Sequence, residues 1–557
     1  MRISKITFNA DNIKNCEHLN LENVTILVGP HNSGKSQFLR DIESWCWNYP
    51  EKLKILKELD LDLPTNVKNI EKLFKDFKIE TPPGQQNNPD VMYIKPPFSM
   101  VNKAYDKISL EHLKNIFSQK RIQGIKDANL NLIVYFMKRL DAKTRLDLVS
   151  DSRRGNMYSY PTNQLDALYR NNLLRKKIRT IINDEFGWFF YLSNLEDENL
   201  KIVLSKNPNL NEHNFGEKSI QQFKKSEHIE YFGDGIKCFI GILVAALAYS
   251  FRILLVDEPE AFLHPSAAHS LGHHLSSVTK KRHSSLVVAT HDANFLMGCL
   301  ESTKKLTILR LTYNYKDGKV TQLKSQDIKK LYTDPILRST DSLSTLFHKS
   351  AIVCEADKDK VFYKGINDKF LLLKNGIKEN IFLNANGKDG IFKLVRPLRR
   401  TGVPVACIYD FDVFKTNDKN KNQTRILWKN IFSACNIDKP VADSLEKQRC
   451  EIIDQLSGYK NQNIFNNFRN SNINSDLLKS IDSFLRRLYE YGIFVVSRGN
   501  LESWLHFSDD QKWLENALHW IEYNKPNIQT DDDSIWSFLL NIKKWINNQA
   551  RKGMPLI

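Results

Sequence analysis

The sequence is poor in cysteine and has no cysteine pair with the spacing of a zinc site or a disulfide framework. It has eight cysteines in 557 residues and no CxxC motif, which is typical of reduced thiols in a cytosolic protein. Long apolar runs are also missing. The most apolar stretch, from Phe239 to Val256, is interrupted by Arg252, and the first residues lack the apolar core of a signal peptide. We therefore expect a cytoplasmic protein without a membrane span.

Acidic residues are outnumbered, which bears on the partners of the protein. Lys and Arg number 81 against 64 Asp and Glu, giving a formal net charge of +17, and this favours polyanionic partners such as DNA. A hydrophobic fraction of 41% and a charged fraction of 26% are ordinary for globular proteins. A chain of this length forms roughly two to four domains. A fibre, a disordered protein and a small disulfide-bonded scaffold are therefore excluded.

A glycine-rich turn follows an apolar, β-branched strand pattern at Val24–Val28. The turn, Gly29-Pro30-His31-Asn32-Ser33-Gly34-Lys35-Ser36, matches GxxxxGK[ST]. Its glycines let backbone N–H groups turn towards phosphates, and the following helix adds its dipole. Lys35 would neutralise the β- and γ-phosphates, and the Ser36 hydroxyl would ligate Mg²⁺. The motif predicts an ATP site; an accidental match in a Gly-containing turn is the alternative for the motif taken alone.

Two later strand patterns end in the other groups that such a site needs. The pattern at 252–256 ends in Asp257 and Glu258, suited to be a Mg²⁺ ligand and a water-activating base. The pattern at 285–289 leads to His291, which can contact a γ-phosphate. A histidine after a strand is more often structural, but the order of the three motifs favours a functional role.

The order of these motifs resembles the ABC-type ATPases of the SMC and OLD (overcoming lysogenization defect) group, as does the ending Glu260-Ala261-Phe262-Leu263-His264-Pro265. In that group a signature loop completes the nucleotide site of a partner subunit. The resemblance therefore implies a homodimer or higher homo-oligomer formed through the ATPase domain. The matching segment is Gly233-Asp234-Gly235. It departs from the LSGGQ of transporters, which bears on the hydrolysis rate more than on nucleotide binding. Gln85 and Gln86 are candidates for the Q-loop glutamine.

A second series of strands and helices begins near residue 351. We expect strands at 351–354, 381–383, 403–409 and 492–497, a helix at 390–400 and a polar helical insertion at 415–490. Glu355 and Asp359 follow the first strand, and Asp410 and Asp412 follow the third. Parallel strands bring such acids to one sheet edge, and alternation along a strand lets Asp410 and Asp412 project to the same side. The acids would repel one another unless Mg²⁺ or Mn²⁺ were bound, and two such ions suit phosphodiester cleavage.

This acidic pattern resembles the Toprim domain, and an ABC ATPase followed by Toprim resembles the OLD nucleases. The resemblance implies an α/β fold: an N-terminal ABC-type ATPase domain with a helical insertion, and a C-terminal, Rossmann-like Toprim domain with helical additions. The predicted domains are 1–345, with about 45–225 as a largely helical insertion and dimerisation region, and 346–557.

The same resemblance assigns roles to individual residues. It makes Glu355, Asp359, Asp410 and Asp412 metal ligands, Glu502 the late acid that also binds metal, and Lys552 the lysine that stabilises transition-state charge. Ala356 stands where these proteins usually have Gly, and we expect only a slight change in loop shape. Asp357 is either an extra ligand or solvated, and we favour solvated.

The sequence thus predicts an ATP-binding, metal-dependent DNA endonuclease or nickase in bacterial defence against phage, with the ATPase domain gating cleavage. Its partners would be DNA and, by resemblance, a helicase-like protein or a reverse transcriptase with its RNA. Of the cationic clusters at 153–154, 175–179, 280–282 and 396–400, only the last lies in the predicted nuclease domain. The alternative is a nucleotide-dependent DNA or partner sensor, or a scaffold, with an inactive Toprim domain. An SMC-type repair ATPase fits less well, because the helical insertion is too short for a long coiled coil and the domain with Asp410 and Asp412 would be unexplained. A topoisomerase fits less well, because no second domain that offers a nucleophilic Tyr is recognisable.

Overall fold

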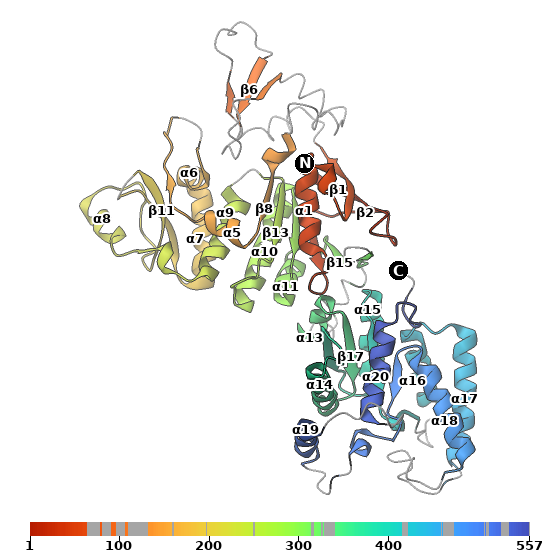
Figure 1. The fold of residues 1–557 in the computed structure, drawn as a ribbon. Helices are drawn as coiled ribbons and strands as arrows, with labels where there is room; N and C mark the ends of the chain where they lie inside the picture. Colours follow the sequence, from red (N-terminus) through yellow and green to blue (C-terminus); the bar gives the residue numbers. More distant parts are fainter. Residues whose placement is uncertain are drawn as a thin grey trace. The chain divides into compact units, whose positions relative to one another are not determined.

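Figure 1 shows a chain that folds into two compact units. The first comprises Met1–Val28 and Asn32–Gln322, and the second comprises Leu323–Ile557 together with Gly29–His31. The computed structural model describes residues 1–63, 78–80, 91–95, 106–109, 132–158, 161–195, 198–248, 251–313, 317–324, 327, 333, 340–414, 421–457, 459, 473–505, 507, 512–524 and 534–555.

A six-stranded sheet in the order β16-β15-β3-β14-β13-β8 lies at the centre of the first unit. Its neighbours pair in parallel except for β16, which pairs antiparallel with β15. The central strands are apolar and buried, as expected of parallel strands that are covered on both faces. The strands are β3 (Val24–Val28), β8 (Met137–Leu140), β13 (Ile253–Asp257), β14 (Ser285–Ala289), β15 (Thr307–Tyr313) and β16 (Gly318–Gln322).

Helices flank this sheet. The closest helix pair is α10 and α11, where a Cβ added at Gly298 would lie 1.9 Å from the carbonyl oxygen of His269, so only glycine allows this approach. The helices are α1 (Lys35–Cys46), α5 (Ala142–Asp147), α6 (Gln164–Arg170), α7 (Asn172–Phe186), α8 (Glu217–Phe223), α9 (Asp234–Ala248), α10 (Pro265–Arg282) and α11 (Ala293–Ser302).

The expectation of a largely helical region at 45–225 is wrong for its described residues. This region contributes β8 to the central sheet and further strands to three smaller sheets. Some of its strands pair with segments far away in the sequence, as β8 does with β13, and local periodicity does not reveal such pairing. The remaining strands of the first unit are β1 (Arg2–Phe8), β2 (His18–Asn20), β4 (Leu56–Asp62), β5 (Lys78–Glu80), β6 (Val91–Lys95), β7 (Asp106–Ser109), β9 (Ser152–Arg153), β10 (Phe189–Ser193), β11 (Asn199–Ser205) and β12 (Glu227–His228).

The second unit is built on a four-stranded parallel sheet in the order β18-β17-β19-β20. The strands are β17 (Ser350–Cys354), β18 (Asn380–Asn384), β19 (Val405–Tyr409) and β20 (Ile493–Val495). All four predicted strands are confirmed. Because the pairing is parallel, the carboxyl ends of β17 and β19 lie at the same sheet edge.

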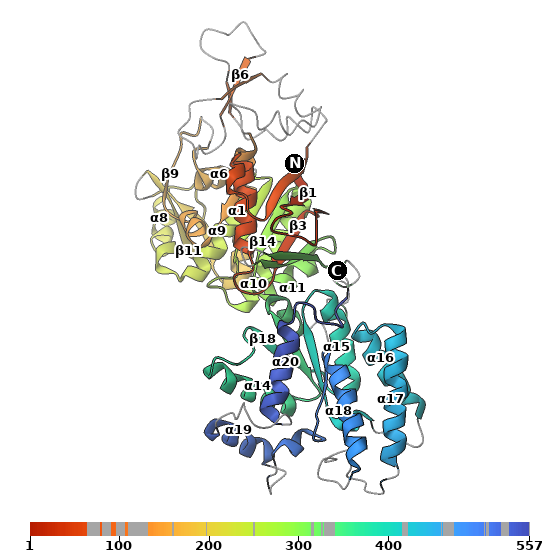
Figure 2. The same ribbon diagram turned by 45° about the vertical axis from the view of Figure 1, so that its right-hand side comes forward.

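Helices surround this second sheet, as Figure 2 shows. The predicted helix at 390–400 is α15, and within the described residues the predicted helical insertion consists of α16, α17 and α18. Tyr363, Trp513 and Phe538 lie in an aromatic-rich core beneath α14, α19 and α20. The helices are α13 (Thr340–Ser344), α14 (Asp357–Leu372), α15 (Lys388–Arg400), α16 (Lys421–Ala434), α17 (Lys439–Ser457), α18 (Ser475–Tyr489), α19 (Trp513–Tyr523) and α20 (Ile535–Asn547). None of the helices in the described parts of the chain has both the length and the hydropathy required to cross a bilayer.

Candidate functional site

The turn after β3 has the backbone of a phosphate-binding loop. Gly29, Asn32 and Gly34 adopt positive φ angles of 142°, 55° and 90°. Gly34 is the N-cap of α1, so the unpaired N–H groups and the dipole of this helix are available to an anion. Lys35 is 5% exposed, and its Nζ donates to Ser33 Oγ at 3.3 Å. The loop therefore has the geometry that its sequence predicts.

Ser36 and the acids after β13 are brought together with His291. Ser36 Oγ donates to Asp257 Oδ1 at 3.0 Å, and His291 Nε2 lies 3.9 Å from Glu258 Oε1. Burial, and secondarily the charge of Glu258, raise the pKa of Asp257. A hydroxyl and a carboxylate at hydrogen-bond distance are the oxygen ligands that Mg²⁺ prefers beside a nucleotide. These residues fit a nucleotide-bound Mg²⁺.

Glu260 and Arg145 position this site, although sequence reasoning assigned neither a role. Glu260 Oε1 accepts a hydrogen bond from the His291 backbone N–H at 2.6 Å, and Arg145 Nη1 donates to the Glu258 carbonyl at 2.8 Å. Burial raises the pKa of Glu260 to about 7. The one signal for Glu260 is that it is the third acid of Asp257-Glu258-Pro259-Glu260.

The Gly233-Asp234-Gly235 segment lies at the start of α9. A Cβ at Gly235 would lie 2.5 Å from the Phe262 carbonyl oxygen, whereas a Cβ at Gly233 would meet nothing within 4 Å. The flanking side chains of Tyr231 and Phe262 are 83% and 63% exposed. The segment therefore packs on the chain after β13 on one side and is open on the other. The Q-loop candidates Gln85 and Gln86 lie outside the described residues.

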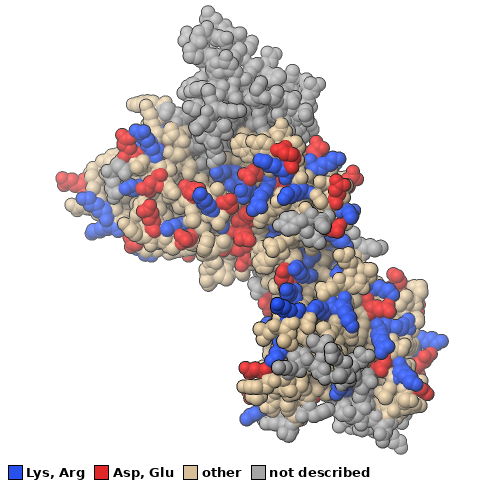
Figure 3. Space-filling model, viewed as in Figure 1, with Lys and Arg blue, Asp and Glu red and all other residues tan. Residues whose placement is uncertain are grey.

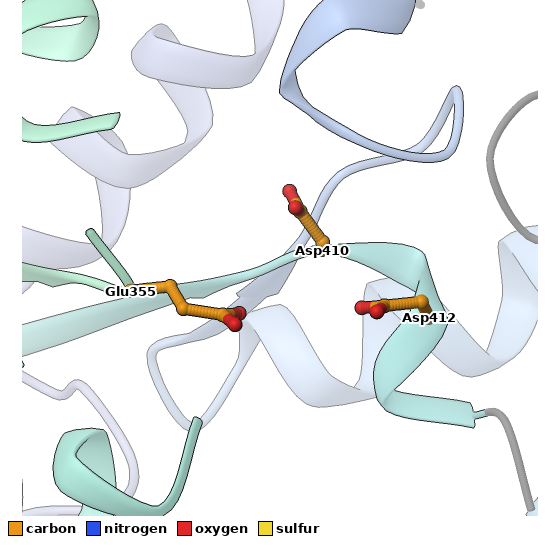
Figure 4. A group of neighbouring side chains, drawn as sticks. All are labelled: Glu355, Asp410 and Asp412. Atoms are coloured by element: carbon orange, nitrogen blue, oxygen red, sulfur yellow. The ribbon is translucent and has the colours of Figure 1, made fainter. Parts of the chain in front are cut away.

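Acids gather at the carboxyl ends of β17 and β19. One carboxylate oxygen from each of Glu355, Asp410 and Asp412 lies within 4.8 Å of the others. Figure 4 shows the side chains of Glu355 and Asp412 pointing towards each other, with Asp410 beside them.

The predicted reason for the proximity of Asp410 and Asp412, alternation along one strand, is wrong. β19 ends at Tyr409, and Asp412 lies in a 3₁₀ turn, Phe411–Phe414. The Phe411 N–H donates to the Gly499 carbonyl at 2.6 Å. The segment that follows β20 therefore holds this turn in place.

Asp410 lies at the electrostatic centre of these acids. Burial raises its pKa to about 8, with further contributions from Asp359, Glu355, Asp412 and Glu502. Burial also raises the pKa of Glu355 to about 7, although Lys388 opposes this shift. The other four predicted acids therefore all act on Asp410.

Two buried oxygens of these acids lack hydrogen-bond partners, namely Glu355 Oε2 and Asp412 Oδ1. Buried carboxylate oxygens without partners are costly. A hard divalent cation at this position would satisfy them and would reduce the repulsion between the acids. The residues present therefore fit such a cation.

Two lysines outside the sequence motifs neutralise the rim of the acid cluster. Lys388 Nζ pairs with Asp412 Oδ2, and Lys358 Nζ pairs with Glu502 Oε1 at 2.5 Å. The Gly387 N–H donates to the Glu355 carbonyl at 2.8 Å, which holds the loop before Lys388 against β17. The only signal in the sequence was the position of Lys388 just after a strand.

Three other predicted residues lie away from the three clustered oxygens. Asp359 Oδ2 accepts from the Ala356 N–H at 3.0 Å and so caps α14, while remaining close enough to raise the pKa of Asp410. Asp357 is exposed. Lys552 pairs with Glu490 Oε2 at 2.6 Å, before the start of β20 and thus at the opposite sheet edge. The structure places Lys552 away from the acids. Its position in the sequence does not indicate which edge of the sheet it reaches.

Of the basic residues in the four cationic clusters, Arg175 and Arg399 are buried and most of the others are exposed. Arg399, in the cluster that lies in the predicted nuclease domain, is completely buried and donates to the carbonyls of Val405, Tyr491 and Gly553. Arg175 is buried against Glu212. On the face drawn in Figure 3, Lys and Arg are interspersed with Asp and Glu over the described surface. Arg399 is therefore structural.

Known proteins with similar sequences include an ATP-binding protein and a nuclease. Residues 68–297 match the family described as "AAA domain, putative AbiEii toxin, Type IV TA system", which is less than half of the chain. The spermidine/putrescine import ATP-binding protein PotA of Mesomycoplasma hyopneumoniae (strain J) is 22% identical over 325 residues, covering 56% of this chain and 64% of PotA. The Old nuclease of Escherichia phage P2 is 28% identical over 178 residues, covering 29% of this chain and 28% of Old. The chain thus spans less than two thirds of the length of either relative.

Solved structures with some likeness include two SMC heads. The SMC head bound to the C-winged helix domain of ScpA has a TM-score of 0.35 and 12% identity, covering 59% of this chain and 100% of that one. The SMC head of Thermotoga maritima has a TM-score of 0.30 and 14% identity, covering 58% and 100%. Such scores are too low to support a conclusion. The sequence matches, together with the phosphate-loop geometry, show that this α/β chain contains an ATP-binding ATPase domain of the AAA/ABC type.

The acid cluster predicts a pH-dependent cation site. Mn²⁺ should bind more tightly as the pH rises from 6.5 to 8.5, by up to about tenfold per pH unit for each proton released, because Glu355 and Asp410 must lose protons. Isothermal titration of the nucleotide-free protein measures this. Asp410→Asn should remove the binding, whereas Asp357→Asn, a matched change at the exposed acid, should leave it unchanged. Equal affinities for wild type and Asp410→Asn would contradict the site.

From the raised pKa of Glu260 we predict that the stability of the first unit depends on pH. Its pKa is raised in the folded state, so its neutral form is favoured there. The contribution of Glu260 to the free energy of unfolding is therefore fully present below the unfolded pKa near 4.5. It falls as the pH rises to about 7, by roughly 3 kcal/mol at most. In melting curves recorded from pH 5 to 8, the melting temperature of Glu260→Gln should rise relative to that of wild type as the pH rises. The exposed control Glu58→Gln should show the same pH dependence of the melting temperature as wild type. The same pH dependence in Glu260→Gln would refute the assignment.

Proposed function

We propose that this protein is an ATP-regulated, metal-dependent DNA endonuclease or nickase whose second unit is a Toprim-like nuclease domain. The observation that carries the proposal is the set of acids at one edge of a parallel sheet, with two buried oxygens lacking partners. The weak similarity to the Old nuclease and the ATPase domain support the same conclusion. Our domain assignment is 1–345 for the ATPase part and 346–557 for the nuclease part.

In this proposal Glu355, Asp410 and Asp412 bind one divalent cation, Mg²⁺ or Mn²⁺. Asp359 and Glu502 lie close enough to raise the pKa of Asp410 and complete the acidic surface. Bound cations of this kind supply a nucleophilic hydroxide and stabilise the charge that develops in phosphodiester hydrolysis. The chain's own contribution is to hold the acids rigidly, through the fully buried β17 and β19 and the Phe411–Gly499 bond.

Lys388 takes the role that the sequence assigned to Lys552. Its ammonium is bonded to a cluster acid and is 26% exposed, so it can turn from Asp412 to a phosphate oxygen of the DNA. A cation beside the scissile phosphate stabilises the additional negative charge of the transition state.

ATP regulates this activity through the first unit. Lys35, Ser36 and Asp257 bind the nucleotide and its Mg²⁺, Glu258 orients or activates water, and His291 contacts the γ-phosphate. The open face of Gly233-Asp234-Gly235, with exposed Tyr231 and Phe262, completes the nucleotide site of a second copy of this chain. Hydrolysis of DNA is downhill, so ATP would control access and would not drive bond cleavage. The setting is the cytoplasm and defence against phage, with a helicase-like or reverse-transcriptase partner.

A second candidate function is a nucleotide-dependent sensor or scaffold with an inactive nuclease domain. The observation that favours it is the pairing of Lys388 with Asp412 and of Lys358 with Glu502, because ammonium groups already neutralise two acids without metal. Metal-dependent cleavage distinguishes the two candidates.

Plasmid cleavage tests the nuclease directly. With Mg²⁺ or Mn²⁺, wild type should nick or linearise supercoiled plasmid, and Asp410→Ala should lower the rate by at least about a hundredfold because it removes the central acid. Gel electrophoresis over time measures the rate, with Asp357→Ala as the matched control that should keep it. Lys388→Met should lose activity by about 10²–10³-fold, as expected for a charge-stabilising group, while Lys552→Met should not. Absence of cleavage by wild type in every metal and nucleotide condition would favour the sensor.

ATP control is tested with Lys35→Ala. Wild-type cleavage should change when ATP is added, whereas the variant should cut at one rate with and without ATP, because the lost ammonium weakens nucleotide binding. The measurement is the cleavage rate at fixed Mn²⁺ over a range of ATP concentrations, with the non-hydrolysable analogue in parallel. Identical ATP responses of wild type and Lys35→Ala would rule out gating by this site.

A further inference from the structure

A groove of about 920 Å³ lies in the second unit, between α18 and α20. Figure 2 shows the two helices beside each other, and both contact each other and the edge of the sheet near β20. The lining residues are Asp482, Leu485, Arg486, Tyr489, Glu490, Ser497, Ser534, Phe538, Asn541, Lys544, Trp545, Asn548, Ala550 and Lys552.

One end of the groove lies next to the acid cluster. Ser497 lines this end, and the residue before it, Val496, donates its N–H to the Tyr409 carbonyl at 2.9 Å, one residue before Asp410. The other end, at Glu490 and Lys552, lies before β20. From Ser534 to Asn548 the wall formed by α20 is about 21 Å long at 1.5 Å per residue. The groove therefore leads along the sheet edge to the site of proposed cleavage.

The walls of the groove carry available positive charge. The side chains of Arg486 on α18 and Lys544 on α20 have no hydrogen bond or ion pair within the part of the chain that the structure describes. The third cation, Lys552, is paired with Glu490. Asp482 is the other acid of the groove lining and offsets part of the positive charge of Arg486 and Lys544. Asn541 and Asn548 on α20 add amides that can donate to phosphate oxygens.

The floor of the groove is apolar and fixed. Tyr489 stacks on Phe494 with ring centroids 4.7 Å apart, and its hydroxyl donates to the Val495 carbonyl at 3.2 Å. Trp545 Nε1 donates to the Glu490 carbonyl at 3.0 Å. Trp545 and Phe538 are 6% and 3% exposed, so the half-buried Tyr489 is the lining ring that a base can reach. A cationic groove with such a ring is typical of proteins that bind single-stranded nucleic acid.

We propose that this groove binds one unpaired DNA strand and leads it to Asp410, an inference that rests on the proposed nuclease function. A volume of about 920 Å³ accommodates a few nucleotides of one strand, whereas a duplex, whose major groove alone is about 12 Å wide, is too large to enter it. The preferred substrate is therefore DNA with a single-stranded region, such as a flap, a gap or an end.

Strand binding without metal tests this proposal separately from cleavage. Anisotropy of a fluorescent 12-nucleotide oligothymidylate should be measured in EDTA, without nucleotide, on the full chain. Arg486→Ala/Lys544→Ala should weaken binding at least about tenfold and reduce the slope of log K against log salt by about 1.4, which corresponds to two lost phosphate contacts. Arg486→Lys/Lys544→Arg, which keeps both charges, should bind like wild type.

The matched control removes two cations outside the groove, Lys447→Ala/Lys479→Ala, and should leave affinity within about twofold, since surface charges far from the strand act only through a screened field. Unchanged strand affinity in Arg486→Ala/Lys544→Ala, or an equal loss in the control pair, would overturn the proposal. A loss of mononucleotide binding with strand affinity intact would also overturn it and would assign the groove to a small ligand. If wild type binds the strand through these residues but cuts no DNA, the groove stands and only the nuclease function fails.

Discussion

Repulsion among half-buried carboxylates around Asp410 is the constraint on which the second unit depends. Burial, together with the charges of four neighbouring acids, raises the pKa of Asp410 to about 8. Folding must hold these groups together against that repulsion. Fully buried strands, the Gly387–Glu355 bond and the Phe411–Gly499 bond fix the backbone that carries them, while Lys388 and Lys358 neutralise the rim. A site that is costly to keep without a cation is one that a cation stabilises strongly.

The nucleotide site of the first unit also holds acidic side chains close together, but different groups interact with them. Its acids also follow buried parallel strands, but Ser36 donates to Asp257, and Glu260 is buried with its oxygen bonded to the His291 N–H. The positive partners there are the loop N–H groups and Lys35. Both units thus place polar chemistry at the carboxyl ends of parallel strands, where the helices that follow begin.

Much of the fold and of the two sites could be predicted from the sequence wherever an apolar strand pattern is followed directly by functional polar residues. Strands such as Val24–Val28 and Val405–Tyr409 are short apolar runs followed by polar residues, so their ends and acids could be predicted together. Strands that depend on distant pairing were missed: β8 contains Lys138 and Arg139, and nothing local indicates that it joins β13. Lys388 was missed and Lys552 misplaced for the same reason. The edge that a lysine reaches depends on loops such as the one that Gly387 fixes, and a linear spacing does not specify it.

The position of Lys388 connects charge balance to control. Without a cation, its ammonium neutralises Asp412 while Asp412 Oδ1 remains without a partner; an arriving metal would compete for the same carboxylate and release the lysine. The lysine would then be free beside the metal, at the point where a phosphate would approach. One side chain would in this way stabilise the metal-free protein and become available for charge stabilisation only when the cation is bound, so that the unloaded site is stable and inactive.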